Sequence, residues 1–418
     1  MPVVPAVPTL AAAVISAAAA FILKLNMQER VTSSDSVPVL DVLDLANARA
    51  VRTAATHLGI FRLTGHQAPI EGILNASHQF FGLSDTIKRS ARSSTGVSGG
   101  FQRGYIPLAG ESGLRDFVEL KEGFCYGRAR RTVAAGASEA ASLGGASEHE
   151  ERTQPSKQQH PPLQSNVSEL QLRSCDQLVS PNAWPEDLAE TDRGWQQTLE
   201  GYIERCHVLS DRLHVALSEA MGRRSDFLAQ LAAGGEDISL MRLFHYFAPT
   251  AFPHVAPGVP RTGSSPHSDW HLVTIVLQDR TGGLQVRRPR KPFDWIDVPA
   301  AEGELIVILG DYLSALSGGS FVSPVHRVLL PAPPQERFSL TYFRYPSCTA
   351  TVSPSAARRA ERRARRQERA RRAHLREDSK FNTLVAPAPG GAGLNVLARR
   401  PWGDLLVDKW NGVASNKV

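Results

Sequence analysis

The stretch Pro266–Val286, PHSDWHLVTIVLQDRTGGLQV, decides the fold predicted for this 418-residue chain. It opens with His267 and Asp269, continues into the apolar run LVTIVLQ and then meets a Gly-Gly pair typical of a turn. Residues i and i+2 of an extended segment point to the same side, so this imidazole and this carboxylate are expected to face a common point. The stretch therefore predicts a β-strand that is preceded by two candidate metal ligands.

A longer β-rich region, from Ile238 to Tyr345, surrounds this stretch. Short apolar runs follow one another there, separated by Gly-Gly, Pro and Asp: ISLMRLFHYF, LQVRR, WIDV, ELIVILGD, HRVLL and FSLTYF. Regularly spaced short strands predict an antiparallel sandwich or barrel. Helical periodicity occurs upstream, at 45–58, from about residue 70, and at 195–221. The expected fold class is therefore mostly β with flanking helices.

A second histidine, His326, begins the run HRVLL, far downstream of His267 and Asp269. Two histidines and one carboxylate on one face leave coordination positions open, which suits an iron(II) ion that must bind a cosubstrate and O2 together. Zinc is a weaker candidate, because closed zinc sites more often recruit thiolates. The four cysteines, Cys125, Cys175, Cys206 and Cys348, form no C-x-x-C pair.

An H-x-D pair alone is a weak signal, because a histidine before a strand is more often structural than a ligand. Arg337 and Ser339 add to it, since they follow His326 on another predicted strand and share one of its faces. A guanidinium beside a hydroxyl can hold the distal carboxylate of a diacid. Arg337 by itself would be interpreted as half of a surface ion pair.

Composition excludes overall disorder, since 42% of the residues are hydrophobic. The net charge of +6 comes from one segment, because residues 357–376 hold ten Arg and two Glu and the rest is near neutral. This Arg-rich stretch, 356–376, is the only hint of a nucleic-acid partner, which is not expected. We interpret it as a solvated helix or a flexible insertion, because its sequence shows no face to bury.

The N-terminal region leaves alternatives open. Residues 10–23 are apolar apart from Ser16, but this run is short for a membrane span, which needs about 20 residues. It has the length of a signal-peptide core, although no Lys or Arg precedes it. A cytoplasmic location is favoured, since scattered cysteines fit a reducing compartment, while a signal or an anchor stays an open alternative and Met27 is a second candidate start.

The chain resembles the isopenicillin N synthase-like branch of the 2-oxoglutarate and iron(II)-dependent dioxygenases. The motifs that carry this resemblance are PHSDWHLVTIVLQDRTGGLQV, WIDVPAAEGELIVILGDYLSALSGGSFVSPVHRV, RFSLTYF, VPVLD, GIFRLTGH, HQFFGL, RGY, LKEGF and NAWP. They cover about residues 37–128 and 180–348. The resemblance implies a jelly-roll (double-stranded β-helix) core preceded by an α/β N-terminal region.

The resemblance also implies roles for individual residues. It assigns the Fe(2+) ligands to His267, Asp269 and His326. It assigns the contacts to the C5 carboxylate of 2-oxoglutarate to Arg337, Ser339 and Tyr246. Three positions depart from the family pattern, with Phe244 for a common Asn, His271 for a common Gly and Ile308 for a common Asn. None of them removes a ligand, but Phe244 weakens the case for the usual polar contacts around the cosubstrate.

The implied function is that of an Fe(II)/2-oxoglutarate-dependent dioxygenase. It would hydroxylate or desaturate a small-molecule substrate, with O2 as second cosubstrate and with release of succinate and CO2. Three alternatives stay open: an Fe(II) oxidase of the same fold that does not use 2-oxoglutarate, a non-catalytic jelly-roll binding module, and a nucleic-acid-associated role of the Arg-rich stretch. A monomer is expected by default, and the identity of the substrate is not indicated.

Seven segments are expected along the chain. They are a leader (1–36), an N-terminal dioxygenase region (37–128), a low-complexity insertion (129–168), a helical scaffold (169–235), the jelly-roll core (236–348), an Arg-rich insertion (349–380) and a C-terminal segment that packs on the core (381–418).

Overall fold

The structure is a computed structural model of the whole chain. It describes residues 36–91, 103–108, 110, 118–128, 181–186, 188, 193–232, 238–252, 259–372 and 394–415. The apolar run 10–23, Met27 and the insertion predicted at 129–168 lie outside the described residues. Within those ranges, no helix combines the length and the apolar character that crossing a membrane would require.

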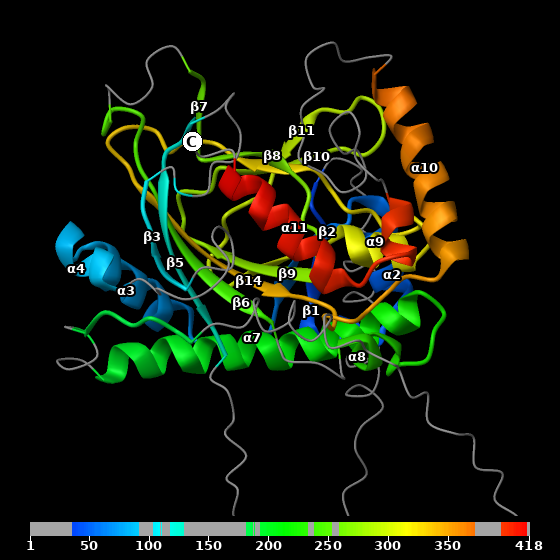
Figure 1. Cartoon of the computed structure of the whole chain (residues 1–418), viewed down its shortest axis with the longest axis horizontal. Helices are drawn as coiled ribbons and strands as arrows, with labels where there is room; N and C mark the ends of the chain where they lie inside the picture. The colour runs from blue at the N-terminus through cyan, green and yellow to red at the C-terminus, as the bar shows by residue number, and fades with distance from the viewer. Residues whose placement is uncertain are drawn as a thin grey trace, which may run out of the picture.

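The strands belong to two facing sheets and one short pair. Their bounds are β1 Val39–Asp41, β2 Ile60–Thr64, β3 Gly104–Ile106, β4 Val118–Glu119, β5 Lys121–Gly127, β6 Leu240–Tyr246, β7 Arg261–Thr262, β8 Ser264–His267, β9 Val273–Gln278, β10 Leu284–Arg287, β11 Trp295–Asp297, β12 Leu305–Leu309, β13 His326–Val328 and β14 Arg337–Arg344. The large sheet has the order β1-β2-β12-β9-β14-β6-β5-β3, the small sheet has the order β11-β10-β13-β8, and β4 pairs with β7 (Figure 1). Neighbouring strands are antiparallel except in β1–β2 and β4–β7. The predicted mostly-β class is confirmed.

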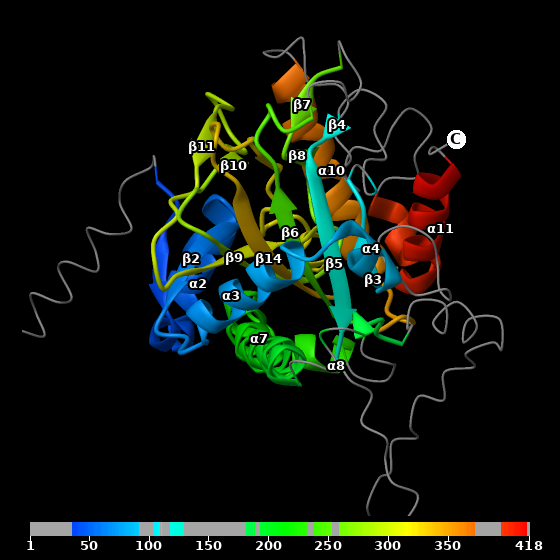
Figure 2. The same cartoon turned by 90° about the vertical axis from the view of Figure 1, so that its left-hand side faces the viewer.

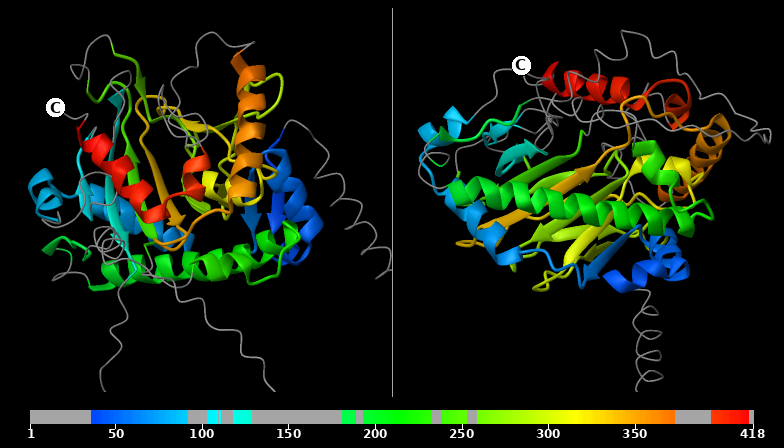
Figure 3. Two further views of the ribbon diagram at one scale, coloured as in Figure 1. Left: turned by 45° about the vertical axis from the view of Figure 1, so that its right-hand side comes forward. Right: turned by 90° about the horizontal axis from the view of Figure 1, so that it is seen from below.

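Helices flank this core. Their bounds are η1 Val42–Ala46, α2 Ala48–His57, α3 Ile70–Phe81, α4 Asp85–Ser90, α7 Arg193–Ala220, α8 Phe227–Ala232, α9 Asp311–Leu316, α10 Pro354–Arg372, η2 Leu394–Ala398 and α11 Trp402–Ser415. The longest, α7, lies across the outer face of the large sheet, while the small sheet faces the other side (Figures 2 and 3). The three helical patterns predicted upstream of the β-rich region correspond to α2, α3 and α7.

The two faces of the large sheet bury different residues, because side chains alternate along each strand. On β14, Phe338, Leu340 and Tyr342 join the core cluster that contains the apolar stripe of α7. The inner face packs against the small sheet, where Tyr246 of β6 joins a second cluster with Val286 and other residues. Residues of β14 that alternate with the outward ones therefore face the interior of the jelly roll.

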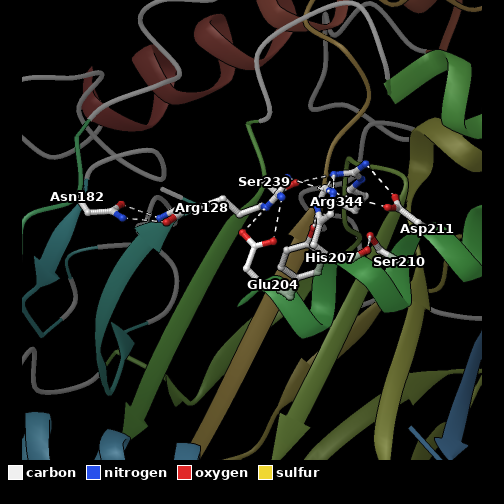
Figure 4. A network of polar contacts seen from close by, with 10 residues as sticks. Arg128, Asn182, Glu204, His207, Ser210, Asp211, Ser239 and Arg344 are labelled. Carbon is white, nitrogen blue, oxygen red and sulfur yellow. Dashed lines mark hydrogen bonds and ion pairs between the residues drawn. The ribbon is translucent and has the colours of Figure 1, made fainter. Parts of the chain in front are cut away.

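The stripe of α7 follows the period of a helix that buries one side. Its buried members are Trp195, Leu199, Tyr202, Ile203, Cys206, Leu209, Leu213, Ala216 and Leu217. Polar contacts fix the same helix to the sheet, as Figure 4 shows: Arg344 of β14 reaches His207 at 2.7 Å and Asp211 at 3.1 Å, while Arg128 pairs with Glu204 at 2.8 Å. Helix α7 is therefore held in register with the strands that carry the interior residues.

The Arg-rich stretch corrects one expectation. Within 354–372 it forms α10, and this helix buries an alanine face made by Ala356, Ala357, Ala360 and Ala364. That face packs against α9 and η2, while the described arginines between these alanines are exposed. The expectation of a segment with no buried face was wrong, because alanine is apolar enough to pack where the neighbouring backbone comes close. Two glycines of the α9 turn, Gly318 and Gly319, make that close approach.

The cysteines differ in state. Cys125 and Cys206 are buried free thiols, as expected for a reducing compartment. Cys348 is disulfide-bonded, and Cys175 lies outside the described residues.

A buried histidine on α7 makes stability depend on pH. His214 is fully buried, and neither of its ring nitrogens has a hydrogen-bond partner in the described part of the chain. Burial, together with the nearby charges of Arg344 and His207, lowers the pKa of His214 to about 3. In the unfolded chain its pKa is near 6.5, so below pH 6.5 the unfolded state binds more protons than the folded state. The free energy of unfolding therefore decreases as the pH is lowered below 6.5.

We expect His214→Leu to flatten this dependence. At pH 5 the wild-type free energy of unfolding should have lost about 2 kcal/mol through this side chain relative to pH 8, because one pKa unit corresponds to about 1.4 kcal/mol. The variant should not show this loss. Urea unfolding of both proteins from pH 8 to pH 5 measures it, and parallel pH profiles would contradict the assignment.

Candidate active site

Three of the predicted residues meet at one point. Strand β8 pairs antiparallel with β13, and the register places His326 opposite His267, with ring centroids 4.3 Å apart. Asp269 lies two residues after the end of β8, and its carboxylate oxygens lie 3.8 Å from His267 Nε2 and 3.9 Å from His326 Nε2. One ligand atom from each of the three lies within 4.8 Å of the others. The structure thus brings together a histidine–aspartate pair and a histidine that are far apart in the sequence.

Backbone carbonyls orient both imidazoles. His267 Nδ1 lies 2.8 Å from the carbonyl of Ser265, and His326 Nδ1 lies 3.2 Å from that of Pro324. A carbonyl only accepts hydrogen bonds, so Nδ1 carries the proton in each ring and Nε2 keeps its lone pair. In both histidines Nε2 faces Asp269. This is the tautomer that a metal ligand requires.

The electrostatics favour the metal-binding protonation states. Burial, followed by the charge of His326, lowers the pKa of His267 to about 4. Burial alone would favour protonated Asp269, but the charges of His326 and His271 outweigh it and hold the pKa of this carboxyl well below its usual range. At neutral pH the site therefore offers an uncharged imidazole and a carboxylate, which are the forms that coordinate divalent metals.

The carboxylate of Asp269 is held by a residue that the sequence did not single out. Thr274, on β9, donates a short hydrogen bond to Asp269 Oδ2, and His271 Nε2 lies 3.7 Å from the same oxygen. Thr274 Oγ1 and His271 Nε2 are themselves 3.2 Å apart. The sequence places Thr274 five residues after Asp269, but only the fold shows that the chain turns back between them and brings the hydroxyl to the carboxylate. His271, noted as a departure, therefore belongs to this cluster.

The turn after β8 is also fixed from α9. The amide of Asp311 donates to the carbonyl of Asp269 at 2.7 Å, and Ser268 donates to the carboxylate of Asp311 at 2.8 Å. Gly310 approaches so closely that a Cβ on it would stand 1.9 Å from the carbonyl oxygen of His271. The helix start thus clamps the loop that carries Asp269.

The predicted cosubstrate residues also meet in the interior. Arg337 is buried, donates to Ser339 Oγ at 3.2 Å and lies 4.5 Å above the ring of Tyr246. Two acceptors that the sequence did not single out hold the same guanidinium: Gln278 Oε1 at 3.1 Å and the carbonyl of Gly282. Gln278 could have been suspected only from its place on the strand that carries Thr274.

A lysine lies beside the departure at Phe244. The side chain of Phe244 is buried on the inner face, and Lys121 Nζ stands 4.8 Å from its ring centroid. Lys121 also contacts Glu119 at 3.1 Å and Ser264 Oγ at 3.5 Å. The register of β5 and β6 places Lys121 opposite Tyr246. Phe244 was expected to remove polar contacts, but the structure places the ammonium group of Lys121 beside it. The spacing of residues in the sequence did not indicate this lysine.

The donor set and its surroundings fit iron(II) and a small diacid. Two imidazoles and one carboxylate on one side match the ligands that non-haem iron(II) takes when it must keep positions open. Thr274, beside Asp269, and Gln278, beside Arg337, lie on one face of β9 and are separated by roughly 13 Å of strand. This spacing leaves room for a diacid bound at the metal by one end and at Arg337 by the other.

The sequence is similar to a family model and to several known proteins. Residues 238–346 match the model of the 2OG-Fe(II) oxygenase superfamily. A 2-oxoglutarate-dependent dioxygenase of Monascus ruber is 27% identical over 67% of this chain and 72% of its own length. Flavone synthase of Petroselinum crispum is 34% identical, over 43% of this chain and 45% of that protein.

Solved structures share the fold. A full-length Neurospora crassa protein, crystallised in complex with alpha-KG, aligns with a TM-score of 0.55 at 22% identity, covering 79% of this chain and 92% of that one. A 2OG-Fe(II) oxygenase family protein from Caulobacter crescentus aligns with a TM-score of 0.54 at 18% identity, covering 77% and 91%. These likenesses confirm the predicted jelly-roll core.

We expect Thr274→Val to weaken metal binding about 10- to 100-fold, because partners that orient a ligand contribute by this amount. The change keeps the shape of the side chain and removes the donor to Asp269 Oδ2. Anaerobic titration calorimetry with Fe(II), and with Mn(II) as a redox-stable probe, measures the affinity. Thr198→Val, on the exposed side of α7, is the matched control. Equal affinities in the two variants would show that Thr274 does not position the carboxylate.

Proposed function

We propose that this chain is a member of the 2-oxoglutarate and iron(II)-dependent oxygenase superfamily that hydroxylates or desaturates a small organic substrate with release of succinate and CO2. One observation carries the proposal: His267, Asp269 and His326 converge in a jelly roll whose interior also buries Arg337. A binding module that had lost catalysis would not need all of these groups together.

The proposed roles follow from the geometry of each group. His267, Asp269 and His326 would hold iron(II) through Nε2 of each imidazole and the carboxylate. When bound, iron(II) with 2-oxoglutarate and O2 supplies the oxidation: one oxygen atom enters succinate, CO2 leaves, and the other oxygen hydroxylates a C–H bond of the substrate or leaves as water after desaturation. The chain itself binds, orients and keeps water away.

Arg337 is arranged to grip a carboxylate. Of its five N–H donors, three are used by Gly282, Gln278 and Ser339 in the described part of the chain. The two that remain are sufficient for a bidentate contact with the C5 carboxylate of 2-oxoglutarate. The ring of Tyr246 lies under the guanidinium and fixes its plane. The cosubstrate would therefore meet a donor that is already oriented before binding.

Apolar residues surround these polar groups. The inner cluster, to which both sheets contribute, contains Phe244, Val276, Leu284, Val286, Ile296, Ile306, Ile308 and Val328. A site enclosed in this way excludes bulk water, which strengthens the contacts to the cosubstrate and protects the reaction from side reactions. His267 is the most accessible of the three proposed ligands, with 30% of its side chain exposed. It therefore marks the open side of the metal centre.

We expect His267→Ala and Asp269→Ala to abolish succinate formation, because each removes one of three proposed iron ligands. The measurement is succinate release from protein loaded anaerobically with iron and then supplied with 2-oxoglutarate and O2. Asp226→Ala, in the α7–α8 connection and with 40% of its side chain exposed, should keep wild-type activity. Iron-dependent turnover that persists in either site variant would count decisively against the assignment.

We expect Arg337→Gln to raise the KM for 2-oxoglutarate about 10- to 100-fold, the usual effect of losing charge-assisted hydrogen bonds. The same assay with 2-oxoglutarate omitted tests the rival oxidase that does not use this cosubstrate. Substrate oxidation without 2-oxoglutarate, together with wild-type kinetics of Arg337→Gln, would favour that rival.

A further inference from the structure

The interior of the jelly roll has a cosubstrate end and a metal end. Arg337 lies at the start of β14, whereas Phe343, six residues on, pairs in register with Thr274 of β9. Thr274 contacts Asp269, so the metal centre lies near the level of Phe343, roughly 13 Å along the strand from Ser339, which the guanidinium of Arg337 contacts. Residues at this level, on the strands beyond β14, are those that a substrate beside the metal would meet.

Arg242 is the first cation at the metal end. It lies on β6 two residues before Phe244 and shares its inward face. The register pairs Arg242 with Thr341 of β14, and its guanidinium carbon lies 5.4 Å from the ring centroid of Phe343. The side chain is buried, and its contact with Phe343 lies two residues along β14 from Thr341, on the side of the metal end.

Arg103 is the second cation. It precedes β3 and is buried against β5, where a Cβ at Gly127 would stand 2.5 Å from its NH2. Its NH1 lies 4.0 Å from Cys125 Sγ, and Cys125 is the register partner of Arg242. Burial lowers the pKa of Arg103, and the positive charge of Arg242 adds to this effect.

Tyr345 connects this pair of arginines with the metal centre. Its ring centroid lies 5.2 Å from that of His271, the neighbour of Asp269. Burial raises the pKa of its hydroxyl; the nearby charges of Arg242 and Arg103 oppose this rise, and that of Asp269 adds to it. Tyr345 thus stands beside His271 and, at 6.4 Å between ring centroids, beside Phe343, the ring that Arg242 contacts.

We propose that Arg103 and Arg242 bind a carboxylate of the substrate, so that this oxygenase acts on a small organic acid. Two guanidinium groups that lie on either side of β5, one before β3 and one on β6, are suited to a carboxylate, which they can hold through several charge-assisted hydrogen bonds. The rings of Phe343 and Tyr345 at the same end offer an apolar contact to the remainder of such a molecule. This inference rests on the proposed function and names its substrate class.

The test compares acids with their uncharged amides. The probes are acetate, hexanoate, benzoate and 3-phenylpropanoate, each with its primary amide, added under nitrogen to the full chain loaded with Mn(II) and 2-oxoglutarate. Titration calorimetry measures binding of each probe. We expect at least one acid to bind about 10- to 100-fold more tightly than its amide, because an ionic partner of this kind contributes by that factor.

Three variants locate the effect. Arg242→Met should remove the preference for the acid, Arg242→Lys should retain part of it, and Arg49→Met, an exposed arginine of α2, should leave it unchanged. The affinity for 2-oxoglutarate should change less than about twofold in all three. Should Arg242→Met not fold, Arg242→Lys and the acid–amide comparison in the wild-type protein still decide the matter.

Three results would overturn the inference: no acid preferred to its amide across the panel, a preference that survives in Arg242→Met, or a loss of 2-oxoglutarate affinity in that variant, which would assign the arginines to the cosubstrate. Slow succinate formation from 2-oxoglutarate alone tests the oxygenase function independently of any substrate. Succinate formation without a preference for acids would therefore refute the substrate class alone, whereas absence of succinate would refute the proposed function.

Discussion

The pairing of β8 with β13 is the contact on which the candidate site depends. It sets His326 opposite His267, and hydrogen bonds from Gly263 N and Thr262 Oγ1 to the carbonyl of Val328 continue the pairing beyond the site. Because side chains alternate along a strand, a slip of one residue would turn one imidazole away from the other. The metal-binding geometry is therefore a consequence of strand register.

The large sheet acts as a common support for the rest of the site. Its inner face carries Thr274 and Gln278 at two levels of one strand, so the metal end and the cosubstrate end are positioned by the same backbone. Its outer face is covered by α7, whose apolar stripe and polar contacts to Arg344 hold the sheet in place. The distance between the metal end and the cosubstrate end is therefore set by the number of strand residues between Thr274 and Gln278.

A second buried polar cluster supports β5 and β6 from behind. Glu122 accepts hydrogen bonds from His245, Tyr105 and Lys88, and these contacts lower its pKa although burial favours its protonated form. Glu122 and His245 are opposite each other in the register and alternate with the inward residues Lys121 and Tyr246. The strands that present the cosubstrate residues are thus cross-linked on their other face to α4. Strand β5 therefore buries a charged residue on each face, Glu122 on the outer one and Lys121 on the inner one.

The sequence by itself determined the strand-rich core and the helix over 195–221, and it identified His267, Asp269, His326 and Arg337 as candidate site residues, because local periodicity and same-face spacing are properties of neighbouring residues. Only the tertiary structure decided which other groups join them. Thr274 reaches Asp269 because the chain turns back, Lys121 reaches Phe244 through strand pairing, and Arg103 reaches Cys125, which β5 places opposite Arg242. The alanine face of α10 likewise depends on glycines of another segment. Such contacts follow from the register and close approach of distant segments, which no local pattern encodes.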